Sequence, residues 1–155
     1  MVLTRNDISL SWFGGPITVE KFTAGISGEI VRDLGKLMHK QRYEKGQTLL
    51  SAETIPDEVV VTLSGQIELA DPSGIDPTRV AEIGEVFGFT ETLAQTRFGR
   101  QLRAASDCEL SVLRRKDLID HLKRSPELCY RSLEVVAENL RSARESALAA
   151  AGKEH

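Results

Sequence analysis

The stretch from Pro56 to Ala70 constrains the fold more than any other part of the sequence. It holds a strand-like run, Glu58-Val59-Val60-Val61-Thr62-Leu63, which Ser64-Gly65 joins to Gln66-Ile67-Glu68-Leu69-Ala70. β-Branched residues favour extended structure, and glycine supplies the positive φ that tight turns need. The alternation of the second run indicates a strand with one buried face and one wet face. We therefore predict a hairpin at the centre of the chain.

Similar extended segments recur along the whole middle of the sequence. They are separated by turn residues, and an interval of roughly 8–12 residues between strands is typical of an all-β roll or sandwich. The polar segment 71–77 is expected to be a hairpin loop and residues 90–95 a short helix. The expected strands are residues 41–43, 48–50, 58–63, 66–70, 78–83, 101–105 and 108–113.

Helical patterns flank this strand-rich middle. Ser27 is an expected N-cap, followed by apolar residues at helical spacing as far as Met38. Residues 116–123 form a short helix, and Pro126 begins a longer one as a first-turn proline. We predict a mainly β protein, a β-roll (double-stranded and jelly-roll-like) with an N-terminal helix and a long C-terminal helix. Its expected parts are an N-terminal arm (1–26), the roll (27–125) and a terminal dimerisation or lid helix (126–155).

Size and charge exclude several classes of function. A chain of 155 residues suits one domain. Its net charge of -3 offers no basic face for nucleic acid. No apolar run approaches the roughly 20 residues that cross a bilayer, and Arg5 and Asp7 interrupt any signal-peptide core. We expect a cytoplasmic protein that contacts neither a membrane nor DNA.

The sequence shows no clear catalytic or metal-binding pattern. Cys108 and Cys129 stand 21 residues apart without a further cysteine, so we interpret them as free, buried thiols. A cupin is the structural rival, but cupins bind metal through strand histidines, which are absent here. The carboxylates Glu82, Glu85 and Glu91 are interpreted as solvated surface groups. We therefore predict a protein that is not an enzyme and holds no metal.

The order of elements and the glycine turns resemble the cyclic-nucleotide-binding domain family. The likeness is to the sensor domains of the catabolite-activator and fumarate-nitrate-reduction regulators, over about residues 27–140. It implies a regulatory module whose pocket takes cyclic AMP, cyclic GMP or another small anion. The stretches that carry it are Lys45-Gly46, Leu63-Ser64-Gly65-Gln66-Ile67, Gly84-Glu85-Val86-Phe87-Gly88 and Cys108-Glu109-Leu110-Ser111-Val112-Leu113.

The resemblance also implies a ligand cassette between Gly84 and Asp107. Phe89 stands where the family has a ribose-binding glutamate, and Phe98 where it has a phosphate-binding arginine. Each lost charge-assisted bond is worth about 1.5–3 kcal/mol, together a large share of a micromolar affinity. A bulge or small register shift that brings one of Arg97, Arg100 and Glu91 into the pocket would restore a polar contact; the alternative is that these charges are solvated. The expected ligand-binding residues are Gly88, Phe89, Thr90, Glu91, Arg97, Phe98, Gly99 and Arg100.

Other ligands of such sensors find less support in the sequence. The fumarate-nitrate type can hold an iron–sulfur cluster, but the N-terminal cysteine cluster that it needs is absent. Haem would need a ligand, and His39 and His121 carry no local signature. A cyclic nucleotide or another small anion therefore remains the ligand that the resemblance suggests.

The terminal helix carries apolar residues at alternating steps of three and four, which is a heptad seam. In related regulators this helix pairs with a second copy and helps to close the ligand pocket. Because alanine buries little area, we expect a homodimer of moderate strength. The expected dimer residues are Leu133, Val136, Leu140, Ala143 and Ala147.

Two functional hypotheses follow from these patterns. In the first, the chain is a regulatory signalling module that senses a small ligand and moves its C-terminal helix. In the second, it is a ligand-free roll used for dimerisation or for docking a protein partner. No helix-turn-helix follows the terminal helix in this sequence, so we expect no direct DNA binding.

Overall fold

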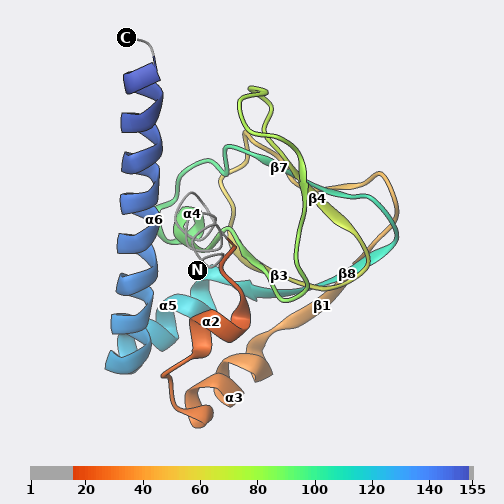
Figure 1. Ribbon diagram of the computed structural model, residues 1–155. Helices are drawn as coiled ribbons and strands as arrows, with labels where there is room; N and C mark the ends of the chain where they lie inside the picture. The colour runs from red at the N-terminus through yellow and green to blue at the C-terminus, as the bar shows by residue number, and fades with distance from the viewer. Residues whose placement is uncertain (1–15, 154–155) are drawn as a thin grey trace, which may run out of the picture.

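The computed structural model describes residues 16–153, and its centre is a β-roll (Figure 1). Two four-stranded sheets, of order β1-β8-β3-β6 and β2-β7-β4-β5, are built entirely from antiparallel pairs. The strands are β1 (His39–Tyr43), β2 (Thr48–Leu50), β3 (Glu58–Ser64), β4 (Ile67–Ala70), β5 (Arg79–Val80), β6 (Val86–Phe87), β7 (Gln101–Ala104) and β8 (Cys108–Arg114). The roll expected from the sequence is confirmed.

The central hairpin shows why these strands form. In β3, Val59, Val60 and Val61 are all buried, because this strand has the roll interior on one face and helices on the other. A strand covered on both faces reads as a continuous apolar run. In β4, Ile67 and Leu69 are buried while Glu68 lies between them half-buried, which matches the expected alternation.

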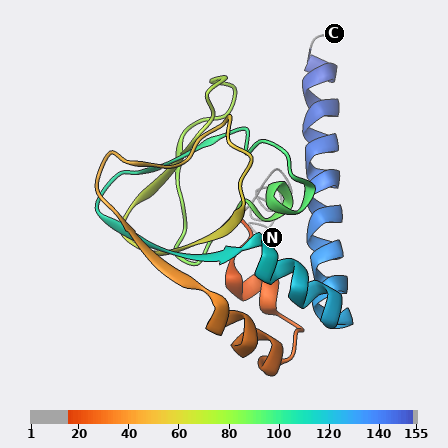
Figure 2. The ribbon, with the colours of Figure 1, turned by 180° about the vertical axis from the view of Figure 1, so that it is seen from behind.

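Five helices surround one side of the roll within the described residues. They are α2 (Val19–Thr23), α3 (Gly28–Leu37), α4 (Phe89–Ala94), α5 (Arg115–Arg124) and α6 (Pro126–Lys153). Both ribbon views show α6 standing beside the roll with α4 between them, while α2, α3 and α5 gather toward the lower end of α6 (Figures 1 and 2). None of these helices has the length and apolar character needed to span a membrane.

The helices and the roll have separate apolar cores, which meet at β3. The roll core lies between the two sheets and includes Ile67, Leu102 and Leu110, each almost fully buried. The helical core joins α2, α4, α5 and α6 to the outer face of β3 and β8 through Phe22, Val59, Phe89, Leu113, Leu118, Leu128 and Val135. A displacement of β3 would therefore alter the packing of both cores, because Val60 belongs to one and Val59 to the other.

Two elements differ from the sequence prediction. The strand expected at residues 78–83 is only Arg79–Val80, because the chain turns at Gly84 to form the unpredicted β6. The segment expected to be an arm contains α2, where Thr18 Oγ1 accepts a hydrogen bond from Lys21 N at 3.2 Å and caps the helix. Residues 1–15 of that arm and residues 154–155 of the terminal helix lie outside the described residues. The division into arm, roll and terminal helix stays a prediction.

Candidate functional site

The cassette begins at Gly88, which turns the chain from β6 into α4. Its φ of +77° lies in the left-handed region, and a Cβ there would come within 3.4 Å of the Glu58 carbonyl oxygen. The same Cβ would lie 3.8 Å from side-chain atoms of Leu50 and Pro56. Glycine thus lets the start of the cassette lie directly against the wall of the roll.

Phe89, the first residue of α4, points into the helical core. Its ring meets the Phe22 ring edge to face with centroids 5.1 Å apart, and only 6% of the residue is exposed. The Arg131 guanidinium lies over the other aromatic ring, 5.9 Å from the Phe22 centroid. Phe89 therefore links α4 to α2 and α6 instead of filling the roll.

Phe98 behaves differently, because it packs half-buried against the roll core. The Phe98 N–H donates to the Thr54 carbonyl at 2.8 Å, and the Gly99 N–H donates to the Ala52 carbonyl at 2.9 Å. Backbone N–H groups at this point would otherwise be donors for a ligand phosphate. Both are already satisfied by the loop that joins β2 to β3.

The two arginines beside Phe98 are turned toward surface carboxylates. Arg97 pairs with Glu53 at 3.2 Å, and Arg100 lies 3.8 Å from Asp76. Glu91 is half-buried in α4, and desolvation raises the pKa of its carboxyl above the usual value. The structure brings neither guanidinium into the roll, so the described cassette presents no side-chain cation to an anion there.

Thr90 provides a polar contact between the cassette and the terminal helix. Its Oγ1 accepts a hydrogen bond from Asn139 Nδ2 at 2.6 Å, in a half-buried position. Arg131 adds a second connection by donating to the Phe22 and Lys21 carbonyls at 2.9 and 2.7 Å. The first two residues of α4 are thus both connected to α6, one by packing through α2 and one by a hydrogen bond.

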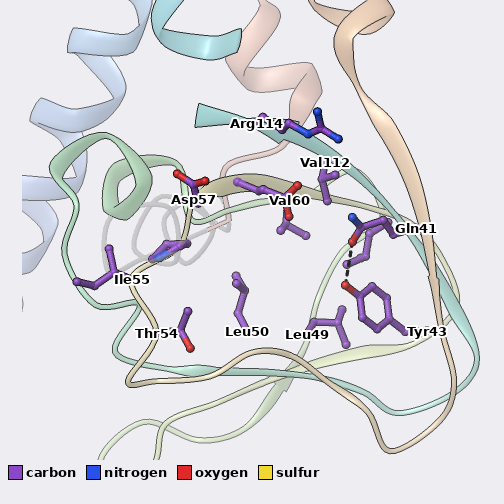
Figure 3. Close-up of a pocket in the computed structure, with 13 residues that line it drawn as sticks. Gln41, Tyr43, Leu49, Leu50, Thr54, Ile55, Asp57, Val60, Val112 and Arg114 are labelled. Carbon is purple, nitrogen blue, oxygen red and sulfur yellow. Dashed lines mark hydrogen bonds between the residues drawn. The ribbon is translucent and has the colours of Figure 1, made fainter. Parts of the chain in front are cut away.

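The roll contains a partly open cavity of about 370 Å³ that the sequence analysis missed (Figure 3). Leu49 and Leu50 rise from β2 on one side, and Val60 and Val112 face them from β3 and β8. None of the eight residues expected to bind ligand lines this cavity. The full lining is Gln41, Tyr43, Leu49, Leu50, Thr54, Ile55, Pro56, Asp57, Glu58, Val60, Leu110, Val112 and Arg114.

One signal in the sequence points to this cavity. Residues at every second position of β8, Leu110, Val112 and Arg114, line it, and so do Gln41 and Tyr43 of β1. Alternate residues of a strand share one face. Gln41, Tyr43 and Arg114 are polar residues on strand faces that are expected to be apolar, and this departure is the signal in the sequence.

Two interpretations of single residues were wrong. Glu85 is not solvated: it is 1% exposed, and Arg79 binds its carboxylate through two hydrogen bonds of 3.0 and 2.6 Å. An ion pair compensates the cost of burying the carboxylate.

Cys129 is exposed while Cys108 is buried, because Cys129 lies on a face of α6 turned away from the helical core. Among residues 16–153 no three His, Cys, Asp or Glu side chains are placed to hold a metal ion.

The terminal helix leaves much of its expected seam uncovered. Leu133 and Leu140 are 63% and 70% exposed, and Ala143 and Ala147 are exposed as well. Val136 is half-buried because it also packs against the helical core. The apolar face formed by Leu133, Leu140, Ala143 and Ala147 is called the α6 stripe below.

The sequence matches the family model described as "Cyclic nucleotide-binding domain" over residues 40–125. This chain belongs to that family. The match covers all eight strands except the first residue of β1, together with α4 and α5. The resemblance inferred from the glycine turns is thereby confirmed. No curated protein matches the sequence at a significant level.

Solved structures of this family share the fold at low identity. The catabolite activator protein of Thermus thermophilus superposes with a TM-score of 0.71 at 20% identity, over 84% of this chain and 62% of that one. The N-terminal domain of a transcriptional regulator from Streptomyces coelicolor gives 0.64 at 21%, over 80% and 91%. A putative cyclic nucleotide-binding protein from Geobacter metallireducens gives 0.62 at 18%, over 76% and 86%. The chain thus spans less than two thirds of the Thermus protein.

Proposed function

We propose that this chain is a cytoplasmic regulatory module, not an enzyme, that senses a small ligand in its roll and passes the change to α6. The observation that carries this proposal is the double connection of α4 to α6. Phe89 packs on Phe22, which Arg131 of α6 covers, and Thr90 binds Asn139. A displacement of α4 by ligand would alter both contacts at once. Coupling between sites needs such a physically connected element with two arrangements.

The family's usual ligand finds little support in the cassette. Phe98 occupies the place of the phosphate-binding arginine, and the Phe98 and Gly99 N–H groups are already bonded. Binding of cyclic AMP or cyclic GMP through Gly88, Phe89, Thr90, Glu91, Arg97, Phe98, Gly99 and Arg100 is what the family resemblance implies, and the contacts within the described cassette argue against it. We expect isothermal titration with either nucleotide to show no micromolar binding. Micromolar binding that Arg100→Ala abolishes would mean that the cassette rearranges around a relocated arginine.

The output that we propose is a homodimer formed through the α6 stripe. The stripe lies on an exposed face of α6, about a quarter of a turn round the helix from the residues that pack into the helical core, so a second copy can cover it without entering the roll. Leucine and alanine at heptad spacing suit a helix pair. The contribution of the leucines is about 1.5–3 kcal/mol for each one that becomes fully buried, consistent with a dimer of moderate strength.

Sedimentation velocity tests this output. We expect the unmodified protein to dimerise and Leu133→Lys/Leu140→Lys to remain monomeric, because two charges would face each other across the seam. Ala149→Lys is the matched control, since Ala149 is exposed on the same helix but lies about half a turn from the stripe. Equal association states for all three proteins would overturn the proposed output.

A ligand-free interaction domain is the second candidate. It is favoured by Phe98, which packs on the roll core, and by the ion pairs that hold Arg97 and Arg100 on the surface. In that case the dimer would form through α6 and no small molecule would change its association constant. Ligand binding in the roll cavity distinguishes the two candidate functions, because a ligand-free domain would bind no small molecule there.

A further inference from the structure

The roll cavity carries a pair of opposite charges that face each other without bonding. Glu58 of β3 and Arg114 of β8 are direct partners in the antiparallel register, and both line the cavity. Such cross-strand neighbours have Cβ atoms about 4.5–5.5 Å apart, and opposite charges there normally pair. Nevertheless, no hydrogen bond or ion pair joins either side chain to another side chain within residues 16–153.

Glu58 lies on the cavity face of β3, two residues before Val60, and lines the cavity. It is half-buried, and its charge contributes to raising the pKa of the Tyr43 hydroxyl, although desolvation is the larger cause. Tyr43 lines the cavity from β1, where its hydroxyl donates to Gln41 Oε1 at 2.9 Å (Figure 3). A half-buried carboxylate without a hydrogen-bond donor favours a ligand that brings a cation.

The opposite charge lies at the rim of the same end. Arg114 and Asp57 are exposed and stand at the upper edge of the cavity in Figure 3. Both also line a neighbouring hollow of about 310 Å³ beside α5, so this end of the cavity opens outward. A guanidinium with free donors can bind a carboxylate with two hydrogen bonds.

Beyond the charged end, the floor and walls of the cavity are formed mainly by Leu49, Leu50, Val60, Leu110 and Val112. Three polar residues line it as well, but the Tyr43 hydroxyl is bonded to Gln41 and the Thr54 hydroxyl to Ser51, so their polar groups already have partners. A volume of about 370 Å³ lies within the range of small-molecule sites, which are mostly apolar with a few placed polar groups. The occupant that fits has an apolar body and carries both an ammonium and a carboxylate at one end.

We infer that the roll cavity binds an apolar α-amino acid or a close analogue, with its ammonium on Glu58 and its carboxylate on Arg114. This inference rests on the proposed sensing function, for which it names the ligand class. The site is distinct from the α4 cassette, none of whose eight expected residues lines it. The ligand would bridge Glu58 of β3 and Arg114 of β8, whose side chains do not pair with each other directly. Arg114 is the last residue before α5, so the ligand would bind at the end of the roll from which α5 and α6 continue.

Three small probes test the assignment on the unmodified protein by isothermal titration. L-Phenylalanine has both charges, 2-phenylethylamine lacks the carboxylate, and 3-phenylpropionate lacks the ammonium. We expect L-phenylalanine to bind and each analogue to bind about tenfold more weakly or worse, since each loses one charge-assisted contact. Equal binding of all three, or no binding of L-phenylalanine at millimolar concentration, would overturn the inference.

Variants that each remove one charge locate the site. Glu58→Gln should weaken L-phenylalanine about tenfold and leave 3-phenylpropionate unchanged, while Arg114→Gln should leave 2-phenylethylamine unchanged. Arg97→Gln is the matched control outside the cavity; if it weakens binding as much as Arg114→Gln, the cassette is the site and the inference fails. Circular dichroism confirms that each variant folds. Failure of the sensing proposal looks different: L-phenylalanine binds as expected while the dimer constant of the α6 stripe does not change.

Discussion

The side-chain amide of Asn139 donates to the Thr90 hydroxyl at 2.6 Å and joins the middle of α6 to the first turn of α4. The bond is half-buried, so solvent competes with it only in part. Beyond Asn139 the residues of α6 are mostly exposed, apart from Ser142 and Glu145. Ser142, about one turn further along, is still buried, so α6 leaves the body of the domain only beyond that residue.

Replacing Asn139 by alanine should loosen α4 without unfolding the roll. The variant loses one hydrogen bond and leaves the Thr90 hydroxyl without its donor, at a cost of about 1 kcal/mol. Hydrogen exchange measured by mass spectrometry should show about fivefold faster exchange of the α4 amides. Arg144→Gln, at an exposed position on α6, is the control and should exchange like the unmodified protein. Unchanged exchange in α4 would mean that the bond does not hold the two helices together.

The sequence predicted the elements whose signal is local. The valine run of β3 and the alternation of β4 each report how a strand is covered, and Pro126 marks the start of α6. β6 was missed because its two residues are extended only through pairing with Val60 and Val61 of β3. No periodicity exists in a segment of that length.

The site was harder to predict because its polar partners come from different parts of the chain. A lone glutamate beside a glycine turn is expected to be exposed, but Glu85 is buried because Arg79, on the other side of the turn, binds its carboxylate. The short helix expected at residues 90–95 is present as α4, yet Arg97 and Arg100 turn toward Glu53 and Asp76 on other loops. The direction of a long side chain is decided by such tertiary partners, which spacing alone does not reveal.

Cys129 offers a direct test of a parallel dimer. It stands four residues before Leu133 and so continues the α6 stripe toward the start of the helix. In a parallel, in-register pair the two Cys129 residues would face each other, within reach of the Cα separation of about 4.4–6.8 Å that a disulfide requires. Mild oxidation should give a covalent dimer on a non-reducing gel.

Matched variants make the crosslink specific. Cys129→Ser should remove it, because Cys108 is buried and desolvation raises the pKa of its thiol. Cys129→Ser/Ala149→Cys carries the thiol on the opposite face of α6 and should not crosslink. A covalent dimer of equal yield from both thiol positions would show random collision instead of a defined seam.

Glu91 should make the protein less stable as the pH rises from acid toward neutral. Desolvation raises its folded pKa above the unfolded value, so the folded state binds more protons in this range. Its contribution is fully present below about pH 4.5 and is lost as the pH rises through the raised folded pKa. Glu91→Gln removes this titration, so thermal melting at neutral pH should occur at a higher temperature than in the unmodified protein. The two melting temperatures should converge in acid; a constant difference at all pH values would contradict the assignment.

The turn between β3 and β4 should tolerate no side chain at Gly65. Its φ of +83° is strained for other residues, and a Cβ would collide with the Asp107 carbonyl oxygen and with Cys108. Because both obstacles lie where the connection between β7 and β8 ends, Gly65→Ala should lower the free energy of unfolding by at least about 2 kcal/mol, from strain and overpacking together.

Gly35→Ala is the matched control, since Gly35 lies in α3 with open space around it. Alanine is the better helix former by about 0.8–1 kcal/mol, so this variant should be stabilised. Urea unfolding of both variants separates the two effects: if they shift the midpoint in the same direction, the crowding at Gly65 does not determine the turn.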